Sequence, residues 1–455
     1  MKMRLAEIAK ALKITPGENW EDIIITSVSF DTRSLQPGAL FIPLVGIHDG
    51  HDYLNRAIEG KAAATLWQSD HQAPENNFPI LSVTDTLAAF QQLAKYYLAK
   101  INPQVVAVTG SNGKTTTKDM VAAILETSFN VQKTHANFNN QIGVPMTILG
   151  MEPNTEILVV EMGMDHFGEL DHLSRLVEPD VAVITMIGEA HIEFFGSRDK
   201  IADAKMEIVH GLKEDGVLVY NGDEPLLRER TKKLLQDTRT FGESGNNDFQ
   251  ALNIVSDEKR TSFRVACWPE DNVTVPMIGS YNVNNALAAL AVGDYFHLPI
   301  KKMISALTTF QATANRTEWL IGKKQERILS DVYNSNPTAA HLVLRAFSQV
   351  PTRGQRFIVL GDMLELGTAA AKLHAGLAAD IDPKQIAEVF LCGSHMAALQ
   401  QALADKFTPE RLHLYASNQK TQLLADLNDL IEPTDLVLLK GSHGIHLEEV
   451  LTALC

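Results

Sequence analysis

The sequence predicts an α/β protein of three domains, in which mostly parallel sheets carry helices on their faces. Short apolar runs that end in glycine or in a charged residue alternate with helical segments of 3.6-residue periodicity, which is the pattern of such sheets. The chain has 455 residues, 45% of them hydrophobic, so it can bury more than one core. We place the domains at residues 1–83, 84–314 and 315–455.

Each domain has its own pattern. The first contains short β-like runs, IIITSVSF and ALFIPLV, separated by turn signals at Pro37-Gly38 and Asp49-Gly50. A helical segment over residues 87–97 opens the second domain, and the strands QVVAVTG, EILVVEMG and DVAVITMIG follow. The third domain contains the strands RILSDVY, RFIVLGD, AEVFLCG, RLHLY and DLVLLKG, each followed by an amphipathic helix. The last two domains are therefore expected to be open α/β sheets.

Composition and charge exclude several classes of protein. The formal net charge of −15 argues against a nucleic-acid-binding face. A local basic pocket for phosphates is compatible with this net charge. Cys267, Cys392 and Cys455 have no metal-ligand spacing, so neither a disulfide framework nor a zinc site is indicated. The N-terminus MKMRLAEIAKALKI reads as a short charged amphipathic helix, and it lacks the apolar core of a signal peptide or membrane span. We expect a cytoplasmic protein.

One segment has the order strand, glycine loop, helix that surrounds phosphate with backbone N–H groups. It is VVAVTGSNGKTTTKD, in which Gly110 and Gly113 permit close backbone approach. Lys114 would supply a charge for the β and γ phosphates, and the Thr115 hydroxyl a ligand for Mg²⁺. The spacing departs from GxxxxGK[ST], because Val108 stands where the first glycine is expected. The alternative is an ordinary glycine turn with a surface lysine.

Two further residues follow predicted strands. Ligands gather beyond the carboxyl ends of parallel strands, and Glu161 and His191 come after EILVV and DVAVITMIG. A carboxylate and an imidazole at this edge would hold Mg²⁺ ions, although each residue taken alone is more often part of a loop. Lys205 lies in the helical stretch KIADAKMEI, and the residues alone favour an exposed, solvated lysine.

A series of motifs between residues 31 and 442 resembles the Mur ligases. These motifs are TGSNGKTTTKDM, THANFNNQIGVP, VVEMGMDHFGEL, GEAHIEFFGS, YNVNNALAALA, SDVYNSNP, VLGDMLELG and LLKGSHG. DTRSLQPGALFIPLVGIHDGHDY is similar to the UDP-binding first domain of the family. The resemblance implies a small α/β N-terminal domain, a central P-loop ATPase domain and a Rossmann-like C-terminal domain. TTTKDM, SDVYNSNP and VLGDMLELG favour the branch that adds D-alanyl-D-alanine to UDP-N-acetylmuramoyl-tripeptide through an acyl phosphate, with release of ADP and phosphate.

The resemblance also implies roles for individual residues. The residues expected at ATP are Gly110, Ser111, Asn112, Gly113, Lys114, Thr115, Thr116, Asn282, Asn285, Arg316 and Asp331. Magnesium would be held by Thr115, Glu161 and His191, and the catalytic residues would be Lys114, His191 and Lys205. Lys205 matches a lysine that is carbamylated in several relatives. The residues expected at the peptide substrates are Asp31, Arg33, Asp49, Gly50, His51, Asn137, Asn139, Asn140, Asn334, Asn336 and Lys440.

Several alternatives remain at this stage. The asparagines at 282 and 285 could cap a helix, those at 137–140 could satisfy a loop backbone, and the NSNP sequence could initiate a turn before Pro337. The competing functions are a related ligase that adds one amino acid to the muramoyl dipeptide, and a nucleotide-operated switch without ligation. We expect a monomer with no nucleic-acid partner.

Overall fold

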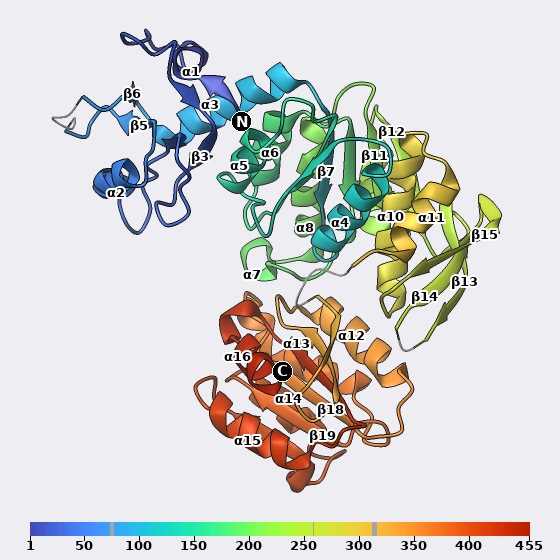
Figure 1. Cartoon of the computed structure of the whole chain (residues 1–455). Coiled ribbons are helices and arrows are strands. Elements are labelled where there is room, and N and C mark those ends of the chain that lie inside the picture. The colour runs from blue at the N-terminus through green and yellow to red at the C-terminus, as the bar shows by residue number, and fades with distance from the viewer. Residues whose placement is uncertain (73–76, 258, 312–315) are drawn as a thin grey trace. The chain divides into compact units, whose positions relative to one another are not determined.

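The computed structural model describes residues 1–72, 77–257, 259–311 and 316–455 (Figure 1). The chain divides into two compact units: unit 1 contains residues 1–109, 128–182 and 207–217, and unit 2 contains residues 110–127, 183–206 and 218–455. The predicted domain boundary at 314/315 lies outside the described residues. Among the described helices, none combines the length and the apolar character that crossing a membrane requires.

Unit 1 begins with the small α/β domain that the sequence predicts. Its elements are β1 (Met3–Arg4), α1 (Leu5–Ala11), β2 (Ile24–Ile25), β3 (Ser27–Ser29), β4 (Ala39–Phe41), η1 (Gly50–Tyr53), α2 (Leu54–Glu59), β5 (Ala64–Gln68) and β6 (Ile80–Val83). Strands β3 to β6 form a parallel sheet in chain order, and β1 pairs with β2 in an antiparallel ribbon. Phe41, Leu54 and Trp67 are buried together, because α2 covers the apolar face of this sheet.

The remainder of unit 1 confirms the helix predicted over 87–97. This helix is α3 (Thr86–Ile101), which begins where the Asp85 carboxylate accepts a hydrogen bond from the Ala88 N–H at 2.9 Å. It ends at Asn102, whose φ of 53° is left-handed. The elements that follow in unit 1 are β7 (Gln104–Thr109), β8 (Val131–Lys133), α5 (Gly143–Leu149), β9 (Ile157–Glu161), α6 (Glu169–Val177) and η2 (Glu207–His210).

A nine-stranded sheet has the order β15-β14-β13-β12-β11-β10-β7-β9-β8. Its other strands are β10 (Val181–Ile184), β11 (Val217–Asn221), β12 (Asp237–Gly242), β13 (Phe249–Ser256), β14 (Thr261–Val265) and β15 (Trp268–Val275). The pairs β7/β9, β8/β9 and β12/β13 are parallel, as expected, whereas β13/β14 and β14/β15 are antiparallel. The sequence did not predict this meander, because its half-exposed strands lack the apolar runs that mark buried parallel strands.

Six described α-helices of unit 2 precede its C-terminal sheet. They are α4 (Lys114–Leu125), α7 (Ile192–Phe195), α8 (Arg198–Met206), α9 (Pro225–Thr231), α10 (Ser280–Tyr295) and α11 (Ile300–Thr308). Figure 1 shows α10 and α11 against the meander, and α10 also packs on α4. A Cβ at Gly293 of α10 would lie 2.4 Å from Met303 Sδ and 2.9 Å from Ile124, so α10 contacts its neighbours with almost no side chain between them.

The C-terminal sheet confirms all five predicted strands. It consists of β17 (Arg327–Asp331), β18 (Arg356–Gly361), β19 (Glu388–Cys392), β20 (Leu412–Tyr415) and β21 (Leu436–Lys440), with β16 (Glu318–Ile321) as an additional edge. The order is β16-β17-β21-β18-β19-β20, and every pair except β16/β17 is parallel. This is the open α/β sheet that the sequence predicts.

Helices cover both faces of this sheet, which explains its fully apolar strands. Leu436 and Leu438 point into a core formed with α12 (Pro337–Gln349), α13 (Ala370–Gly376) and α14 (Met396–Leu403). Val437 and Leu439 point into a second core, formed with α15 (Lys420–Leu430) and α16 (Glu448–Leu454). The alternation follows from the two-residue period of a strand.

We predict that Leu438→Ala destabilises the C-terminal sheet. Leu438 has no exposed surface, so the substitution should leave a cavity and lower the free energy of unfolding by about 2–5 kcal/mol. The matched control is Leu235→Ala at a side chain that is 97% exposed, for which the change should stay within about 0.5 kcal/mol. Thermal unfolding of the two variants provides the comparison, and equal melting temperatures would contradict the layered core.

Candidate active site

The predicted phosphate loop has the conformation that only glycine adopts readily. Gly110 and Gly113 have φ values of 149° and 80°, and α4 begins directly after Gly113. A Cβ at Gly110 would lie 1.8 Å from Thr185 Oγ1, and one at Gly113 would lie 2.3 Å from Asn285 Oδ1. The N–H groups at the N-terminal end of α4 and the helix dipole favour an anion here. An ordinary glycine turn would not require Thr185 and Asn285 to occupy the positions where the side chains of residues 110 and 113 would lie.

Two lysines, Lys114 and Lys205, interact electrostatically at this loop. Lys114 Nζ donates to the Gly110 carbonyl at 2.8 Å and lies 3.5 Å from the Ser111 carbonyl oxygen. Lys205 of α8 is only 2% exposed, so the expectation of a solvated lysine is wrong. Burial, and then the charge of Lys114, hold the pKa of Lys205 well below its usual range. An anionic group such as a phosphate fits beside this pair.

The two asparagines of the predicted adenine site brace α10 against α4. Asn282 Nδ2 donates to the Ile278 carbonyl at 2.8 Å, and Asn285 Nδ2 donates to Asn282 Oδ1 at 3.1 Å. Asn285 Oδ1 accepts a bond from Thr117 Oγ1 of α4 at 3.2 Å. The alternative that these asparagines cap the helix is wrong, because the N-cap of α10 is Gly279. Asn285 therefore connects the phosphate loop to the segment expected at the base.

In unit 1, Glu161 ends β9 and is 2% exposed. Its Oε1 accepts a hydrogen bond from Asn139 Nδ2 at 2.8 Å, so two residues that the sequence singled out separately are brought together. Asn140 Oδ1 accepts from the N–H groups of Ile142 and Gly143 at 3.1 and 2.9 Å. The loop-backbone alternative is therefore correct for Asn140. Asn137, like Asn140, is exposed.

His191 lies on the loop before α7 with a φ of 62°, a conformation that is strained for a residue with a side chain. Its Nδ1 is 2.6 Å from Glu365 Oε2, a partner that the sequence did not predict. Thr115 is buried at the start of α4. Hydroxyl and carboxylate oxygens are ligands that Mg²⁺ accepts, so these residue types fit the ion. Glu161 belongs to unit 1 and the other two to unit 2, and their joint action on magnesium stays a prediction.

In the C-terminal sheet, Asp331 and Lys440 form an ion pair in which Lys440 is buried and Asp331 is partly buried. Lys440 Nζ, at the end of β21, lies 2.6 Å from Asp331 Oδ2 and donates to the Asn334 carbonyl at 3.0 Å. Asn336 has an extended backbone and caps α12 through the Ala339 N–H, so a helix cap and not a turn precedes Pro337. Lys440 of β21 therefore contacts the SDVYNSNP motif at the Asp331 side chain and at the Asn334 main chain.

Two further contacts in unit 2 involve predicted nucleotide residues. The amides of Asn336 and Asn112 exchange two hydrogen bonds, of 2.6 and 3.1 Å. The Arg316 guanidinium lies 4.1 Å from the centre of the Tyr333 ring, which stacks on His443. Ser111 is a buried residue of the phosphate loop, and Thr116 lies in the first turn of α4. Thr185, whose hydroxyl binds the Asn112 carbonyl, was missed, although its place directly after β10 is the signal that found Glu161.

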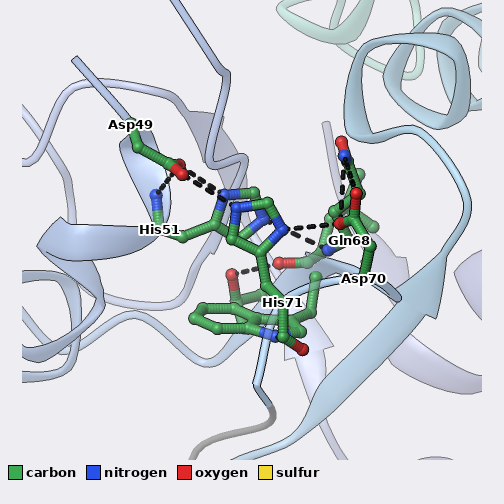
Figure 2. Close-up of polar contacts among 8 residues, drawn as sticks. Asp49, His51, Gln68, Asp70 and His71 are labelled. Atoms are coloured by element: carbon green, nitrogen blue, oxygen red, sulfur yellow. Dashed lines mark hydrogen bonds and ion pairs between the residues drawn. The ribbon is translucent and has the colours of Figure 1, made fainter.

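The residues predicted at the UDP-linked substrate make internal bonds. Arg33 is exposed and pairs with Asp31 at 2.7 Å, and the Arg33 contact lowers the pKa of the Asp31 carboxyl. Asp49 caps η1 through the His51 N–H at 2.9 Å. A Cβ at Gly50 would lie 2.6 Å from the Leu44 nitrogen, so the loop needs glycine there. Both ring nitrogens of His51, which is 6% exposed, have partners within the chain (Figure 2).

Comparison with known proteins identifies the family. The family model of the Mur ligase middle domain matches residues 108–293, and that of the Mur ligase glutamate ligase domain matches residues 315–443. The chain is 42% identical to the UDP-N-acetylmuramoyl-tripeptide–D-alanyl-D-alanine ligase of Bacillus subtilis strain 168 over 448 residues, which is 98% of this chain and 96% of that one. This chain belongs to the Mur ligase family.

Solved structures of Mur ligases have the same fold. Crystal structure I of MurF from Acinetobacter baumannii superposes with a TM-score of 0.88 at 27% identity and covers 100% of this chain and 99% of that one. MurF from Thermotoga maritima, solved in complex with ADP, gives a TM-score of 0.82 at 27% identity and covers 94% and 96%. In the present chain, the region that matches the Mur ligase middle domain begins at the end of β7 and includes the phosphate loop and Lys205.

We predict that Gly113→Ala abolishes nucleotide binding. The new methyl group would push Asn285 away from the loop, and a φ of 80° costs a residue with a side chain about 1–2 kcal/mol. The matched control is Gly168→Ala, because Gly168 has a φ of 86° and nothing within 4 Å of its Cβ position. Isothermal titration with ADP should show a loss of roughly 100-fold or more for the first variant only. If both variants lost the same affinity for ADP, the loss in Gly113→Ala could not be assigned to the contact between the new methyl group and Asn285.

Proposed function

We propose that this Mur ligase joins D-alanyl-D-alanine to UDP-N-acetylmuramoyl-tripeptide at the expense of ATP, and forms UDP-N-acetylmuramoyl-pentapeptide for cell-wall synthesis. The observation that carries the proposal is the glycine loop with its two lysines, in a chain that is similar over 98% of its length to a ligase of this specificity. A nucleotide switch would need the loop but not the acid-binding and amine-binding motifs. The ADP-bound relative supports nucleotide binding at this loop.

The chemistry follows from the leaving group. An amine cannot displace oxide from a carboxylate, so the terminal carboxylate of the tripeptide first attacks the γ-phosphorus of ATP, and ADP leaves. The acyl phosphate that forms has phosphate as its leaving group. The amine of D-alanyl-D-alanine then attacks the acyl carbon, and the tetrahedral intermediate collapses to the amide with loss of phosphate and a proton. No covalent bond to the enzyme is required.

The residues of the loop act by position and charge. Lys114 holds negative charge on the transferring phosphoryl group, and the N–H groups at the start of α4 hold the neighbouring phosphate oxygens. Asn282, Asn285, Arg316 and Asp331 are assigned to the adenosine. Magnesium, held by Thr115, Glu161 and His191, would neutralise further phosphate charge. Thr115 and Glu161 provide the oxygen ligands that the ion prefers.

The substrates are assigned to different blocks of the chain. Residues 1–83 would bind the UDP portion, residues 84–314 would bind ATP, and residues 315–455 would bind the dipeptide, with Lys440, Asn334 and Asn336 near its carboxylate. Asn137, Asn139 and Asn140 would face the muramoyl peptide, and the bond from Asn139 to Glu161 supports a common location for them and the metal ligand. We further propose a monomer that works in the cytoplasm, where its nucleotide substrates are made.

We predict that ADP forms continuously, beyond a single turnover of the enzyme, only when UDP-N-acetylmuramoyl-tripeptide and D-alanyl-D-alanine are both present, and that Lys114→Ala lowers this steady rate by roughly 1000-fold or more. The exposed Lys232, also in unit 2, provides the control, because Lys232→Ala removes one positive charge at a distance from the loop. A coupled assay for ADP measures both. Replacement of the dipeptide by free diaminopimelate or lysine tests the single-amino-acid alternative, and turnover without any amine would favour the switch.

Lys205 generates a second prediction for this function. Because burial lowers the pKa of Lys205, its amine is neutral more often than that of an exposed lysine, and the neutral amine can add CO₂ to give a carbamate and a proton. The carbamate would pair with the Lys114 ammonium. We expect a ¹³C NMR signal from ¹³CO₂-treated enzyme that disappears in Lys205→Ala but persists in Lys118→Arg, which alters the other buried lysine near the loop. An unmodified Lys205 under turnover conditions would contradict this assignment.

A further inference from the structure

A hydrogen-bonded cluster in the N-terminal block joins the Asp49 loop to the end of β5. We call it the clasp: Asp49, His51, Gln68, Asp70 and His71 (Figure 2). The first two belong to the DGHDY segment that the sequence assigned to the UDP-linked substrate, and the other three belong to the end of β5 and the turn after it. His71 had no predicted role.

The tautomer of His51 is fixed by the backbone. The Gln68 N–H donates to His51 Nε2 at 3.1 Å, so this nitrogen carries a lone pair and the proton lies on Nδ1. Nδ1 then donates to Asp49 Oδ1 at 2.7 Å. A metal ion would need one of these two nitrogens, and both are occupied. The close approach of Asp49, His51 and His71 is therefore better explained by proton-mediated bonds than by a cation.

His71 closes the clasp between two carboxylates. Its Nε2 lies 2.8 Å from Asp49 Oδ2, and its Nδ1 lies 2.7 Å from Asp70 Oδ1. Carboxylate oxygens only accept hydrogen bonds, so both nitrogens must carry protons to satisfy both acids, and the ring is then an imidazolium. The ring also stacks on neutral His51, with 3.9 Å between centroids and 18° between planes. Neutral His71 could hold only one of the two acids.

The loop held by the clasp is compact. The Gly50 N–H donates to the Leu44 carbonyl at 2.9 Å, and Val45 pairs with Asp49 across the loop. Asp49 connects this loop to the turn after β5 through His71 and to η1 through His51. The orientation of the loop relative to the sheet is therefore fixed by charged bonds as well as by the backbone.

We propose that His71 is a positioning residue for the UDP-linked substrate: its imidazolium holds Asp49, and hence the Val45–Tyr53 loop, in the shape that binds, and loss of its proton loosens the loop. This inference rests on the proposed function of the N-terminal block. His71 need not touch the substrate, because it acts through Asp49. A loop that is in the binding shape only part of the time weakens the apparent affinity by the same fraction.

The direction of the pH dependence follows from the charges that face His71. Among the described residues these are Asp49 and Asp70, with His51 neutral. The hydrogen bonds that His71 donates to Asp49 and then to Asp70 raise the pKa of His71 above its ordinary value of 6.5. Burial would raise the pKa of Asp49, but its bonds from His51 and His71 lower it to about 2, so Asp49 stays ionised. The clasp is complete near pH 6.5 and opens as the pH rises through the raised pKa of His71.

The test compares His71→Gln with His172→Gln, which alters an exposed histidine on α6 of unit 1, outside the clasp and the Val45–Tyr53 loop. We expect His71→Gln to raise the KM for UDP-N-acetylmuramoyl-tripeptide roughly fivefold at pH 6.5, to leave kcat within about twofold, and to abolish the rise of KM between pH 6.5 and 9. The His172→Gln enzyme should behave as wild type. An unchanged KM and pH profile in His71→Gln, or an equal effect of His172→Gln, would overturn the proposal.

Asp70→Asn provides a second variant in case His71→Gln fails to fold. It keeps the Asp49 bond but removes one charge, so the midpoint of the KM profile and the His71 NMR titration should both move to lower pH. The histidine titration requires no substrate. If His71 titrates as expected but wild-type enzyme makes no pentapeptide, the proposed function fails and not the clasp. If ligation is normal and the titration of His71 is that of a free histidine, the clasp fails alone.

Discussion

The fit between the phosphate loop and the side chains behind it is the constraint on which the rest of the site depends. Thr185 and Asn285 occupy the positions where side chains at Gly110 and Gly113 would lie, so the backbone of the loop is free to face a ligand. Asn285 also connects α4 to α10 through Thr117, and Lys114 returns to the loop carbonyl at Gly110. The same contacts therefore position the phosphate loop, the Lys114 ammonium and the helix α10 that is expected at the adenine.

Much of the fold could be predicted from the sequence because its signals are local. Short apolar runs identified β7, β9, β10 and all five parallel strands of the C-terminal sheet, and period 3.6 identified α3. The meander β13–β15 was missed, since its alternating, half-exposed residues resemble loops. The edge strand β16 was missed for the same reason.

The site was predicted less completely, because partners distant in sequence decide it. Glu161 and the phosphate loop were found from their positions after strands. Glu365 and His71 were not found, since no local pattern indicates that they would meet His191 and Asp49. Thr185 was missed although it directly follows β10, because its bond to Asn112 joins residues far apart in sequence. Lys205 could not be recognised as buried, because α8 has little amphipathic contrast and only tertiary packing removes this side chain from water.

The account claims that the nucleotide bound at the loop activates the carboxylate of the tripeptide by phosphorylation. The most direct test uses UDP-N-acetylmuramoyl-tripeptide labelled with ¹⁸O in both oxygens of the reacting carboxylate, together with unlabelled ATP and D-alanyl-D-alanine. If an acyl phosphate forms, each phosphate released carries one ¹⁸O, because the bridging oxygen leaves with phosphorus, and mass spectrometry will detect it. Phosphate without ¹⁸O, released alongside pentapeptide, would contradict the account.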